Sequence, residues 1–429
     1  MTILWITNII FPEAEVLLKG SGELKSSGGW MLGAANALLQ NEEMHLHVAT
    51  VCRDVSDLRV LQGERITYYL IPFGKGNTKP NPAYEPYCLQ IRDMVKPDVV
   101  HIHGTEFSQG LAYVNACGAE NVVVSIQGMK SAYYYYYYYG LTKTEVLRNI
   151  TLRDMIRGTL FDGKRAFQQA GEYEKELLSK VHHIIGRTSW DRARTWAINP
   201  EAEYHFCNET LRPEFYDGAR WEYEKCQKHS IFLSQAGYPI KGLHMLLRAM
   251  PLILRHYPDT IIRIAGGDIT HPQKRFGLPM LTGYGKIIKK MICQYGLQDQ
   301  VQFVGNMNAA DMKQEYLRAN VFVCPSSIEN SPNSLGEAQI VGAPCVASYA
   351  GGIPDMMRGD EEHLYRFEEV EILAYVICDC FAHSSHNTVN PLQNKASDRH
   401  SPDENAKQLQ HIYASILNKT KSYGSGKNL

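Results

Sequence analysis

The sequence has little net charge and no long apolar run, and each absence excludes a class of protein. Its 44 Lys and Arg residues against 45 Asp and Glu leave a formal charge of −1 over 429 residues. This balance disfavours an electrostatic grip on nucleic acid. No stretch approaches the ~18 apolar residues of a membrane span. The start of the sequence lacks a basic leader, so we expect a cytoplasmic protein.

Metal-binding and dinucleotide-binding patterns are also missing. The ten cysteines show no CxxC spacing, and we expect reduced thiols that lie mostly in the core. No DxD pair stands at a strand end, and no metal cofactor is expected. The loop Ser26-Ser27-Gly28-Gly29 is not a GxGxxG sequence, which disfavours a dehydrogenase.

Short apolar runs instead alternate with amphipathic stretches throughout the chain. This alternation is typical of parallel sheets covered by helices on both faces. It restarts after the polar segment 213–229, which predicts two doubly wound α/β units. The predicted organisation is an N-terminal domain (1–215) completed by a helix over 402–418, a C-terminal domain (216–382) and an irregular connection (383–401). The predicted strands are 3–11, 45–52, 66–73, 99–103, 121–128, 183–188, 229–237, 260–268, 300–305, 319–326 and 343–351.

The strongest candidate site lies between Glu329 and Glu337, where a polar loop follows a predicted strand and precedes a predicted helix. Backbone amides of such a loop, and the positive end of the helix, suit an anionic ligand. In open α/β sheets ligands bind at this carboxyl edge. A capping carboxylate and a surface glutamate are the plain alternative.

Other glycine-containing junctions share this position after a strand. Lys241-Gly242 follows the first strand of the second unit, where a lysine suits a phosphate group. Gly266-Gly267 and Gly351-Gly352 permit close backbone approach. Gly28-Gly29 is expected to form a backbone-amide anion site in the first unit.

In their order and spacing these motifs resemble the family 4 retaining glycosyltransferases of GT-B fold. Glu329 and Glu337 meet the E-x7-E signature of that family. The resemblance covers most of the chain, from Gly28 to about residue 356. It implies two Rossmann-like domains that face each other across a cleft.

The family's residue roles carry over by position. The resemblance implies that Lys241 grips the donor diphosphate, Glu329 contacts the donor sugar and Glu337 binds the ribose. The base is expected near Gly267 and Gly305. The complete set of donor-binding candidates is Gly28, Gly29, Gln127, Arg187, Lys241, Gly267, Asn330, Ser331, Asn333, Ser334, Leu335 and Glu337, with Glu329 and Lys241 as the catalytic pair.

The sequence departs from the family at three positions. Ala236 stands where an arginine is usual, and Arg187 is the candidate replacement; an interdomain salt bridge is its alternative role. Gln127 replaces a common histidine and cannot act as an acid or base. The loop from Asn330 to Ser334 lacks the usual glycine and phenylalanine, which alters the sugar pocket.

Three further features bear on the acceptor. His101 and His103 share one face of a strand, and with Glu106 they are candidate acceptor-binding residues; core packing is the alternative. Seven tyrosines, 133–139, predict either a loop or short helix with an aromatic surface, or a platform for a sugar or lipid headgroup. The basic segment 143–157 fits a helix packed on the sheet or one that lies on an anionic membrane.

The predicted function is metal-independent transfer of a sugar from a nucleotide sugar, with UDP or GDP as the expected nucleotide, to a glycan or lipid-linked glycan. The expected setting is bacterial surface polysaccharide assembly, with a peripheral contact at the inner membrane face. A GT-B epimerase or phosphorylase is one alternative. A non-catalytic nucleotide-sugar binder is the other, favoured by Ala236 and Gln127.

Overall fold

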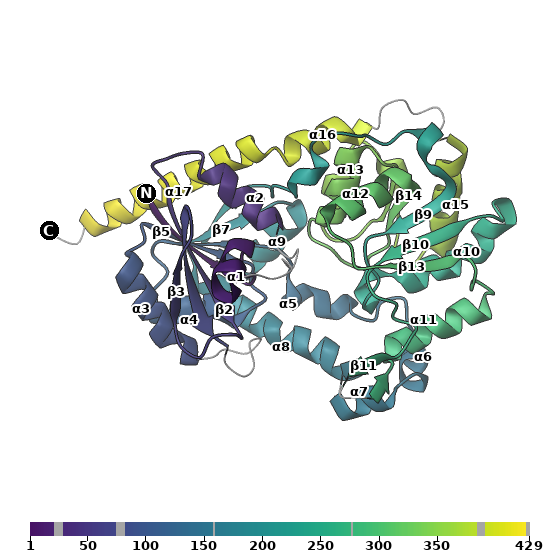
Figure 1. The fold of residues 1–429 in the computed structure, drawn as a ribbon, viewed down its shortest axis with the longest axis horizontal. Coiled ribbons are helices and arrows are strands. Elements are labelled where there is room, and N and C mark those ends of the chain that lie inside the picture. The colour runs from purple at the N-terminus through teal and green to yellow at the C-terminus, as the bar shows by residue number, and fades with distance from the viewer. Residues whose placement is uncertain (21–28, 74–81, 158, 276–277, 384–390, 426–429) are drawn as a thin grey trace. The chain divides into compact units, whose positions relative to one another are not determined.

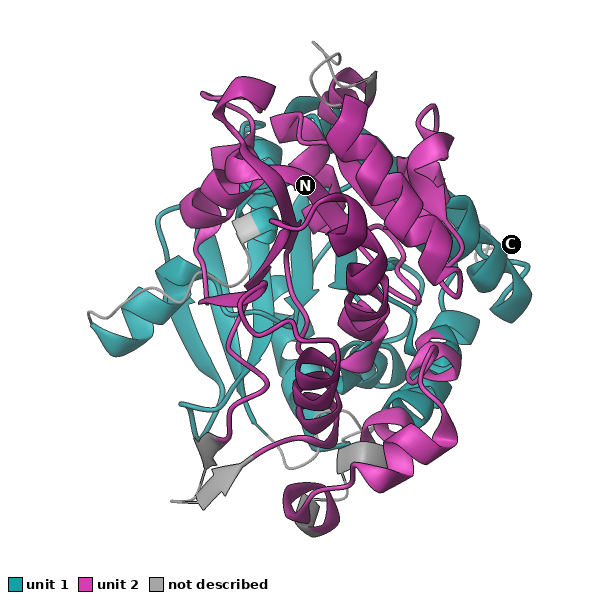
Figure 2. Ribbon diagram, turned by 90° about the vertical axis from the view of Figure 1, so that its right-hand side faces the viewer, with its two compact units in different colours: residues 1–132, 167–212, 399–429 teal, residues 133–166, 213–398 magenta. Residues whose placement is uncertain are grey.

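The computed structural model describes residues 1–20, 29–73, 82–157, 159–275, 278–383 and 391–425. The chain forms two compact units (Figure 2). Unit 1 comprises residues 1–132, 167–212 and 399–429, and unit 2 comprises 133–166 and 213–398. Among the described residues, no helix combines the length and apolar character needed to cross a bilayer.

Unit 1 is built on an eight-stranded sheet, in the order β3-β4-β2-β1-β5-β6-β7-β8. Only β3 runs antiparallel to its neighbour. Its strands are β1 (Thr2–Thr7), β2 (His45–Cys52), β3 (Arg59–Gln62), β4 (Ile66–Pro72), β5 (Val99–His103), β6 (Val122–Ser125), β7 (His183–Gly186) and β8 (Glu203–Phe206).

Helices cover both faces of this sheet, because most of its strands are apolar on both sides. One face packs against α3 (Glu85–Val95), α4 (Ser108–Cys117) and α8 (Thr159–Lys180). The other packs against α2 (Gly29–Leu38) and α17 (Pro402–Ser425), which lie beside each other (Figure 1). The shorter α1 (Pro12–Lys19) and α9 (Ser189–Ile198) complete the unit.

The C-terminal helix α17 belongs to the core of unit 1. Its predicted apolar face, Leu409, Ile412, Tyr413 and Ile416, is buried there. The helix starts as its sequence predicts, with Pro402 first and the Glu404 amide donating to Ser401 Oγ at 3.3 Å.

Unit 2 contains a six-stranded parallel sheet, in the order β13-β10-β9-β14-β15-β16. Its strands are β9 (Gln227–Leu233), β10 (Ile261–Ala265), β13 (Val301–Gly305), β14 (Ala319–Cys324), β15 (Cys345–Ser348) and β16 (Leu364–Tyr365). One face packs against α10 (Leu243–His256), α11 (Gly283–Gln294) and α15 (Val370–His383). The other carries α12 (Ala309–Arg318) and α13 (Asn333–Val341), with an aromatic cluster of Phe215, Phe232, Tyr316 and Phe322.

The predicted strands are all present, and the prediction of two doubly wound units is confirmed. The prediction missed edge strands β3, β8 and β16 and the hairpin of β11 (Gln273–Arg275) and β12 (Leu278–Met280). The connection predicted as irregular over 383–401 contains helix α16 (Pro391–Arg399). Residues 143–182 form three helices: α6 (Lys143–Arg148), α7 (Leu152–Arg157) and α8.

Residues 133–166, which we call the arm, pack with unit 2 although they precede part of unit 1 in sequence (Figure 2). The boundary predicted at 215/216 placed this segment in the N-terminal domain. The arm includes the whole tyrosine run, which continues from α5 (Lys130–Tyr133) into a 3-10 turn over Tyr134–Tyr136.

Candidate active site

The carboxyl ends of the strands of unit 2 hold a pocket of about 390 Å³. The chain that follows β9 lines it with Ser234 to Gly237, and the chain that follows β10 lines it with Gly266 and Gly267. Ala236, where the family resemblance implies an arginine, is buried in this lining. Gly266 reaches its place with φ +103° and donates to the Gly305 carbonyl at 2.7 Å. The pocket lies at the strand ends where the nucleotide base is expected.

Lys241 and Glu329 form a buried ion pair, with Nζ and Oε1 2.5 Å apart. Their side chains are only 12% and 11% exposed. Burial alone would lower the pKa of Lys241, but the Glu329 carboxylate raises it above its ordinary value. Ser326 Oγ donates to the same Glu329 oxygen at 2.9 Å. The two residues predicted as the catalytic pair, 88 positions apart, are therefore in direct contact.

Two glycines allow the backbone segments around this pair to approach closely. Gly242 has φ +72°, and a Cβ there would lie 1.6 Å from the Pro325 carbonyl oxygen. Gly351 has φ +59°, and a Cβ there would lie 1.9 Å from the Glu329 carbonyl oxygen. The Gly352 amide donates to that oxygen at 3.0 Å. Side chains at these glycines would push apart the segments that carry Lys241 and Glu329.

The predicted anion site lies at the start of α13. Pro332 precedes the helix, and Asn333, Ser334 and Leu335 form its first turn, with half-buried Asn333 and Ser334 side chains. The Leu335 amide donates to the Pro332 carbonyl at 2.9 Å. The amides that begin a helix otherwise lack partners within it, and the positive end of the helix favours an anion there. In the preceding loop Asn330 is buried and Ser331 half-buried.

Glu337, one turn further along α13, is 4% exposed. It accepts a hydrogen bond from Tyr316 Oη at 3.3 Å. This contact ties it to the aromatic cluster beneath the sheet. A ribose contact by Glu337 stays a prediction.

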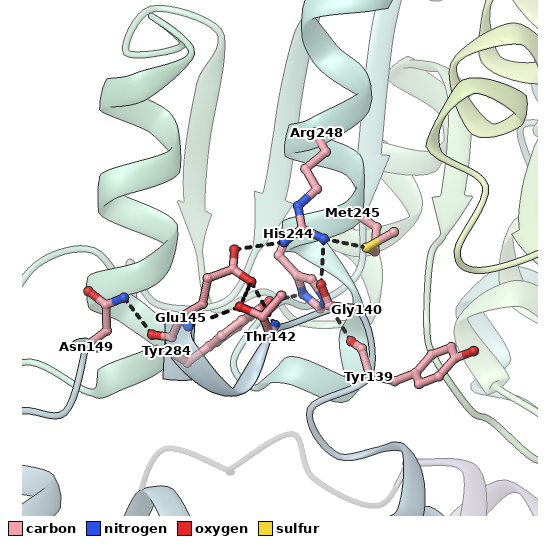
Figure 3. Close-up of polar contacts among 9 residues, drawn as sticks. All are labelled: Tyr139, Gly140, Thr142, Glu145, Asn149, His244, Met245, Arg248 and Tyr284. Carbon is pink, nitrogen blue, oxygen red and sulfur yellow. Dashed lines mark hydrogen bonds and ion pairs between the residues drawn. The ribbon is translucent and has the colours of Figure 1, made fainter. Parts of the chain in front are cut away.

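The arm is hydrogen-bonded to helix α10, just after Lys241 (Figure 3). His244 donates from Nε2 to the Tyr139 carbonyl at 3.0 Å, and its Nδ1 lies 3.2 Å from Tyr284 Oη. Burial lowers the pKa of His244 to about 4, so its ring is neutral near pH 7. Arg248 donates to the Gly140 carbonyl at 2.5 Å and pairs with Glu145 at 3.0 Å.

The loop that carries Glu329 also forms a hydrogen bond with the arm. Ser327 Oγ donates to the Tyr136 carbonyl at 3.0 Å, and the Ser327 amide donates to Ile240 at 2.8 Å. The backbone of the tyrosine run therefore contacts both segments of the Lys241–Glu329 site. Tyr135 and Tyr139 remain 61% and 44% exposed, as the surface-loop interpretation predicts.

The other predicted donor-binding residues lie in unit 1. Arg187 is buried and pairs with Glu209 at 2.5 Å, while also donating to the Ile126 carbonyl at 2.6 Å. The predicted alternative was a salt bridge between domains, but this partner belongs to the same unit. Gln127 is half-buried after β6, Gly29 begins α2, and Gly28 lies outside the described residues.

His101 and His103 share one face of β5, with their rings stacked 3.8 Å apart. Both are buried: His101 Nδ1 lies 2.6 Å from Tyr413 Oη, and His103 packs on Trp5 at 4.4 Å. Desolvation lowers the pKa of His101 to about 3 and that of His103 in the same direction. They line a cavity of about 50 Å³ together with Arg187.

Glu106 follows β5 and accepts from the Gly128 amide at 3.2 Å. Burial raises the pKa of its carboxyl group. An acceptor contact by Glu106, His101 or His103 stays a prediction.

Sequence reasoning missed the residue that bonds the ion pair and the residues that hold the arm against it. Ser326 and Ser327 precede Glu329 in the motif, and their position next to a carboxylate was the available signal. His244 and Arg248 lie one turn apart on a predicted helix, and nothing in the sequence distinguishes them from other polar residues of that helix. No sequence pattern indicates that this face meets the arm.

Residues 220–377 match the family model of the glycosyl transferases group 1. A GDP-mannose-dependent mannosyltransferase from Mycolicibacterium smegmatis, which acts on phosphatidylinositol monomannoside, is 29% identical over 124 residues. That match covers 27% of this chain and 29% of the relative. The chain matches its first curated relatives over only 28–30% of their length.

Solved structures resemble the chain over nearly its full length. Sucrose-phosphate synthase from Thermosynechococcus elongatus superposes with a TM-score of 0.69 at 16% identity, over 97% of this chain and 99% of that one. Anabaena HepE in complex with UDP-glucose gives 0.64 at 14% identity, over 96% and 99%. These similarities establish the fold predicted from the motifs. The chain has the GT-B fold, and its residues 220–377 match the model of the glycosyl transferases group 1 family.

Proposed function

We propose that this protein is a retaining glycosyltransferase that moves a sugar from a nucleotide-sugar donor to a hydroxyl group of a glycan or lipid-linked glycan. The observation that carries the proposal is the buried Lys241–Glu329 pair in unit 2. Both residues lie in loops that follow the carboxyl ends of strands of unit 2. Loops at these strand ends also line the 390 Å³ pocket and lead into α13. The group 1 family match over the same residues supports it.

The chemical task is to stabilise the nucleoside diphosphate as its bond to the anomeric carbon breaks. Lys241 brings a fixed positive charge, and the first-turn amides of α13 bring preorganised donors. In the proposed reaction the acceptor oxygen bonds to the anomeric carbon on the face that the diphosphate leaves. Because the new bond forms on that face, the configuration is retained, and the acceptor proton passes to the leaving phosphate oxygen.

Glu329 is suited to positioning rather than to nucleophilic attack. Its carboxylate already accepts from Lys241 Nζ and Ser326 Oγ, which fixes its orientation. A fixed negative charge beside the sugar favours the positive charge that develops on the ring as the bond breaks. Double displacement would instead need a nucleophilic carboxylate on the opposite face of the sugar.

We propose that transfer needs no metal cofactor, because Lys241 and the helix amides supply the positive charge that a divalent ion would otherwise supply. The donor is a UDP-sugar or a GDP-sugar. HepE was solved with UDP-glucose, and the mycobacterial relative uses GDP-mannose. The pocket at Gly266 and Gly267 is our candidate for the base.

We further propose a lipid-linked acceptor and a peripheral contact with the inner face of the cytoplasmic membrane, in bacterial surface polysaccharide assembly. On the arm, Leu147, Leu152 and Met155 are 54%, 70% and 73% exposed. Lys143 and Arg148 are exposed beside them. Apolar and basic side chains together suit an anionic membrane surface.

The first experiment is a thermal-shift series with UDP, GDP, ADP, CMP and their common sugars, each with and without EDTA. A ligand at 100 times its Kd adds about 2.7 kcal/mol to the free energy of unfolding. We expect selective stabilisation by one nucleoside diphosphate, and a ligand-induced shift that EDTA does not change. Release of free nucleoside diphosphate only when acceptor is present then separates a transferase from an epimerase.

Two results would contradict the proposal. If the protein binds no nucleotide, the absence of the usual arginine at position 236, where Ala236 stands, has abolished donor binding. A chain that binds nucleotide sugar but never turns it over, even by slow hydrolysis, is a non-catalytic binder.

A further inference from the structure

Two histidines and a glutamate meet on one face of the last two strands of unit 1. His183 begins β7 and Glu203 begins β8, and the two residues pair in the sheet register. His205 lies two residues beyond Glu203. Because strand side chains alternate between faces, all three project from the same face. None of them belongs to the proposed transferase site.

The three side chains place their ligand atoms around one point. His183 Nδ1 lies 3.1 Å from His205 Nε2 and 3.3 Å from Glu203 Oε2, and His205 Nε2 lies 3.9 Å from that oxygen. A tetrahedral ion with ligands at 2.0–2.2 Å requires separations of about 3.4 Å between ligand atoms. The observed triangle is therefore close to one face of such a tetrahedron.

The surroundings of the three side chains also suit a metal ion. A histidine binds a metal through the lone pair of a neutral ring nitrogen. The side chains of His183 and His205 are 7% and 10% exposed, whereas Glu203 is 41% exposed. One side of the cluster is thus open to a water ligand.

Lys419 of α17 competes for the same carboxylate, since its ammonium group forms an ion pair with Glu203. In this arrangement Lys419 is the cation that balances Glu203. A divalent ion must share or displace that partner.

We propose that His183, Glu203 and His205 form a binding site for a zinc-type divalent transition metal, with water as the fourth ligand. Two imidazole nitrogens favour zinc and its neighbours over magnesium or calcium, which prefer oxygen. The metal ties edge strand β8 to β7. We assign the site a structural role, because it joins these two strands and shares no residue with the proposed transferase site.

The test uses the full chain with any affinity tag removed, stripped of metal with EDTA and dialysed. Titration with Co²⁺ should give the visible absorption of tetrahedral cobalt at one equivalent, and Zn²⁺ should displace it. Zn²⁺ should also raise the Tm of the free protein, while the nucleotide-induced shift stays the same with and without EDTA. These readouts are independent of transferase activity.

Four variants identify the ligands. His205→Gln and Glu203→Gln should each weaken Co²⁺ binding at least about tenfold. Glu203 is partly exposed, so its variant is expected to fold, and the Tm of each metal-free variant checks this. His182→Gln is the matched control, because His182 is the adjacent, exposed histidine and should bind cobalt normally. Lys419→Met should tighten binding, because it frees Glu203.

The proposal fails if the wild-type chain shows no tetrahedral cobalt spectrum at one equivalent. It also fails if His205→Gln and Glu203→Gln bind as tightly as wild type. Weaker binding by Lys419→Met would remove Glu203 as a ligand and overturn the three-residue site.

Discussion

At the scale of single residues, the main feature of unit 2 is that its key lysine and glutamate hold each other in place. Two buried charges at 2.5 Å satisfy one another and fix two side chains that would otherwise be flexible. Ser326 adds a third contact to the carboxylate. In the proposed reaction, the donor diphosphate would therefore meet a lysine whose position is already set, which is the preorganisation that electrostatic catalysis needs.

Replacement of either charged residue should abolish most of the transferase activity. Lys241→Ala and Glu329→Ala should each lower kcat/KM on the order of 10²-fold or more, the effect of losing one preorganised electrostatic contact. Steady-state release of nucleoside diphosphate measures this. The two effects should not add in the double variant, because the residues act as a pair.

The control for this prediction is Lys225→Ala, which removes a lysine of the same unit whose side chain is 72% exposed. It should keep full activity. Removing one partner of a buried pair also destabilises a protein, so the Tm of every variant is measured alongside. Wild-type turnover by folded Lys241→Ala would exclude the diphosphate assignment.

At the scale of the secondary-structure elements, the arm depends on the backbone carbonyls of Tyr139 and Gly140. Gly140 has φ +79°, and a Cβ there would lie 2.9 Å from His244 Nε2. Only a residue without a side chain lets the arm approach α10 so closely. The seven tyrosines before it thus end at a position that requires glycine.

Loss of Arg248 should loosen the arm. Arg248→Ala removes the bonds to Gly140 and Glu145 (Figure 3). A loss of about 1 kcal/mol in local stability corresponds to about fivefold more frequent opening. Limited trypsin digestion should therefore cleave after Lys143 and Arg148 about five times faster. Arg255→Ala, an exposed position on the same helix, is the matched control and should behave as wild type; equal cleavage of both variants would contradict the role of Arg248.

The sequence predicts secondary-structure elements well where apolar runs are long. It predicts them poorly where an element forms only because it pairs with a neighbouring strand. Runs such as VVHIH over Val99–His103 are buried on both faces, so their pattern alone indicates a strand. Strand β3 (Arg59–Gln62) is largely exposed, and only its pairing with β4 makes it a strand. The loop motif indicates Glu329 and the junction indicates Lys241, but their contact depends on the folding of two distant segments.

At the scale of the whole molecule, the exposed apolar and basic side chains of the arm predict where the protein is found. Wild-type protein should float with vesicles that contain anionic lipid and remain in solution with neutral ones. The double variant Leu152→Glu/Met155→Glu should lower partitioning at least about tenfold, since burying each side chain contributes about 1.5–3 kcal/mol. Flotation through a density gradient measures both.

A matched surface change separates this effect from a general loss of apolar area. Tyr375→Glu alters a side chain that is 68% exposed on α15 and should leave flotation unchanged. Equal flotation of the arm variant and wild type, or no flotation of wild type with anionic vesicles, would contradict the membrane contact.

The hydrogen bond between Trp5 and Tyr413 joins residues 408 positions apart and has a consequence for biosynthesis. Strand β1 leaves the ribosome long before the helix that covers its face and before Tyr413, which also bonds His101. All segments of unit 2, which ends at residue 398, are translated between them. The uncovered apolar face of unit 1 must therefore be kept from aggregating until α17 has followed unit 2 out of the ribosome.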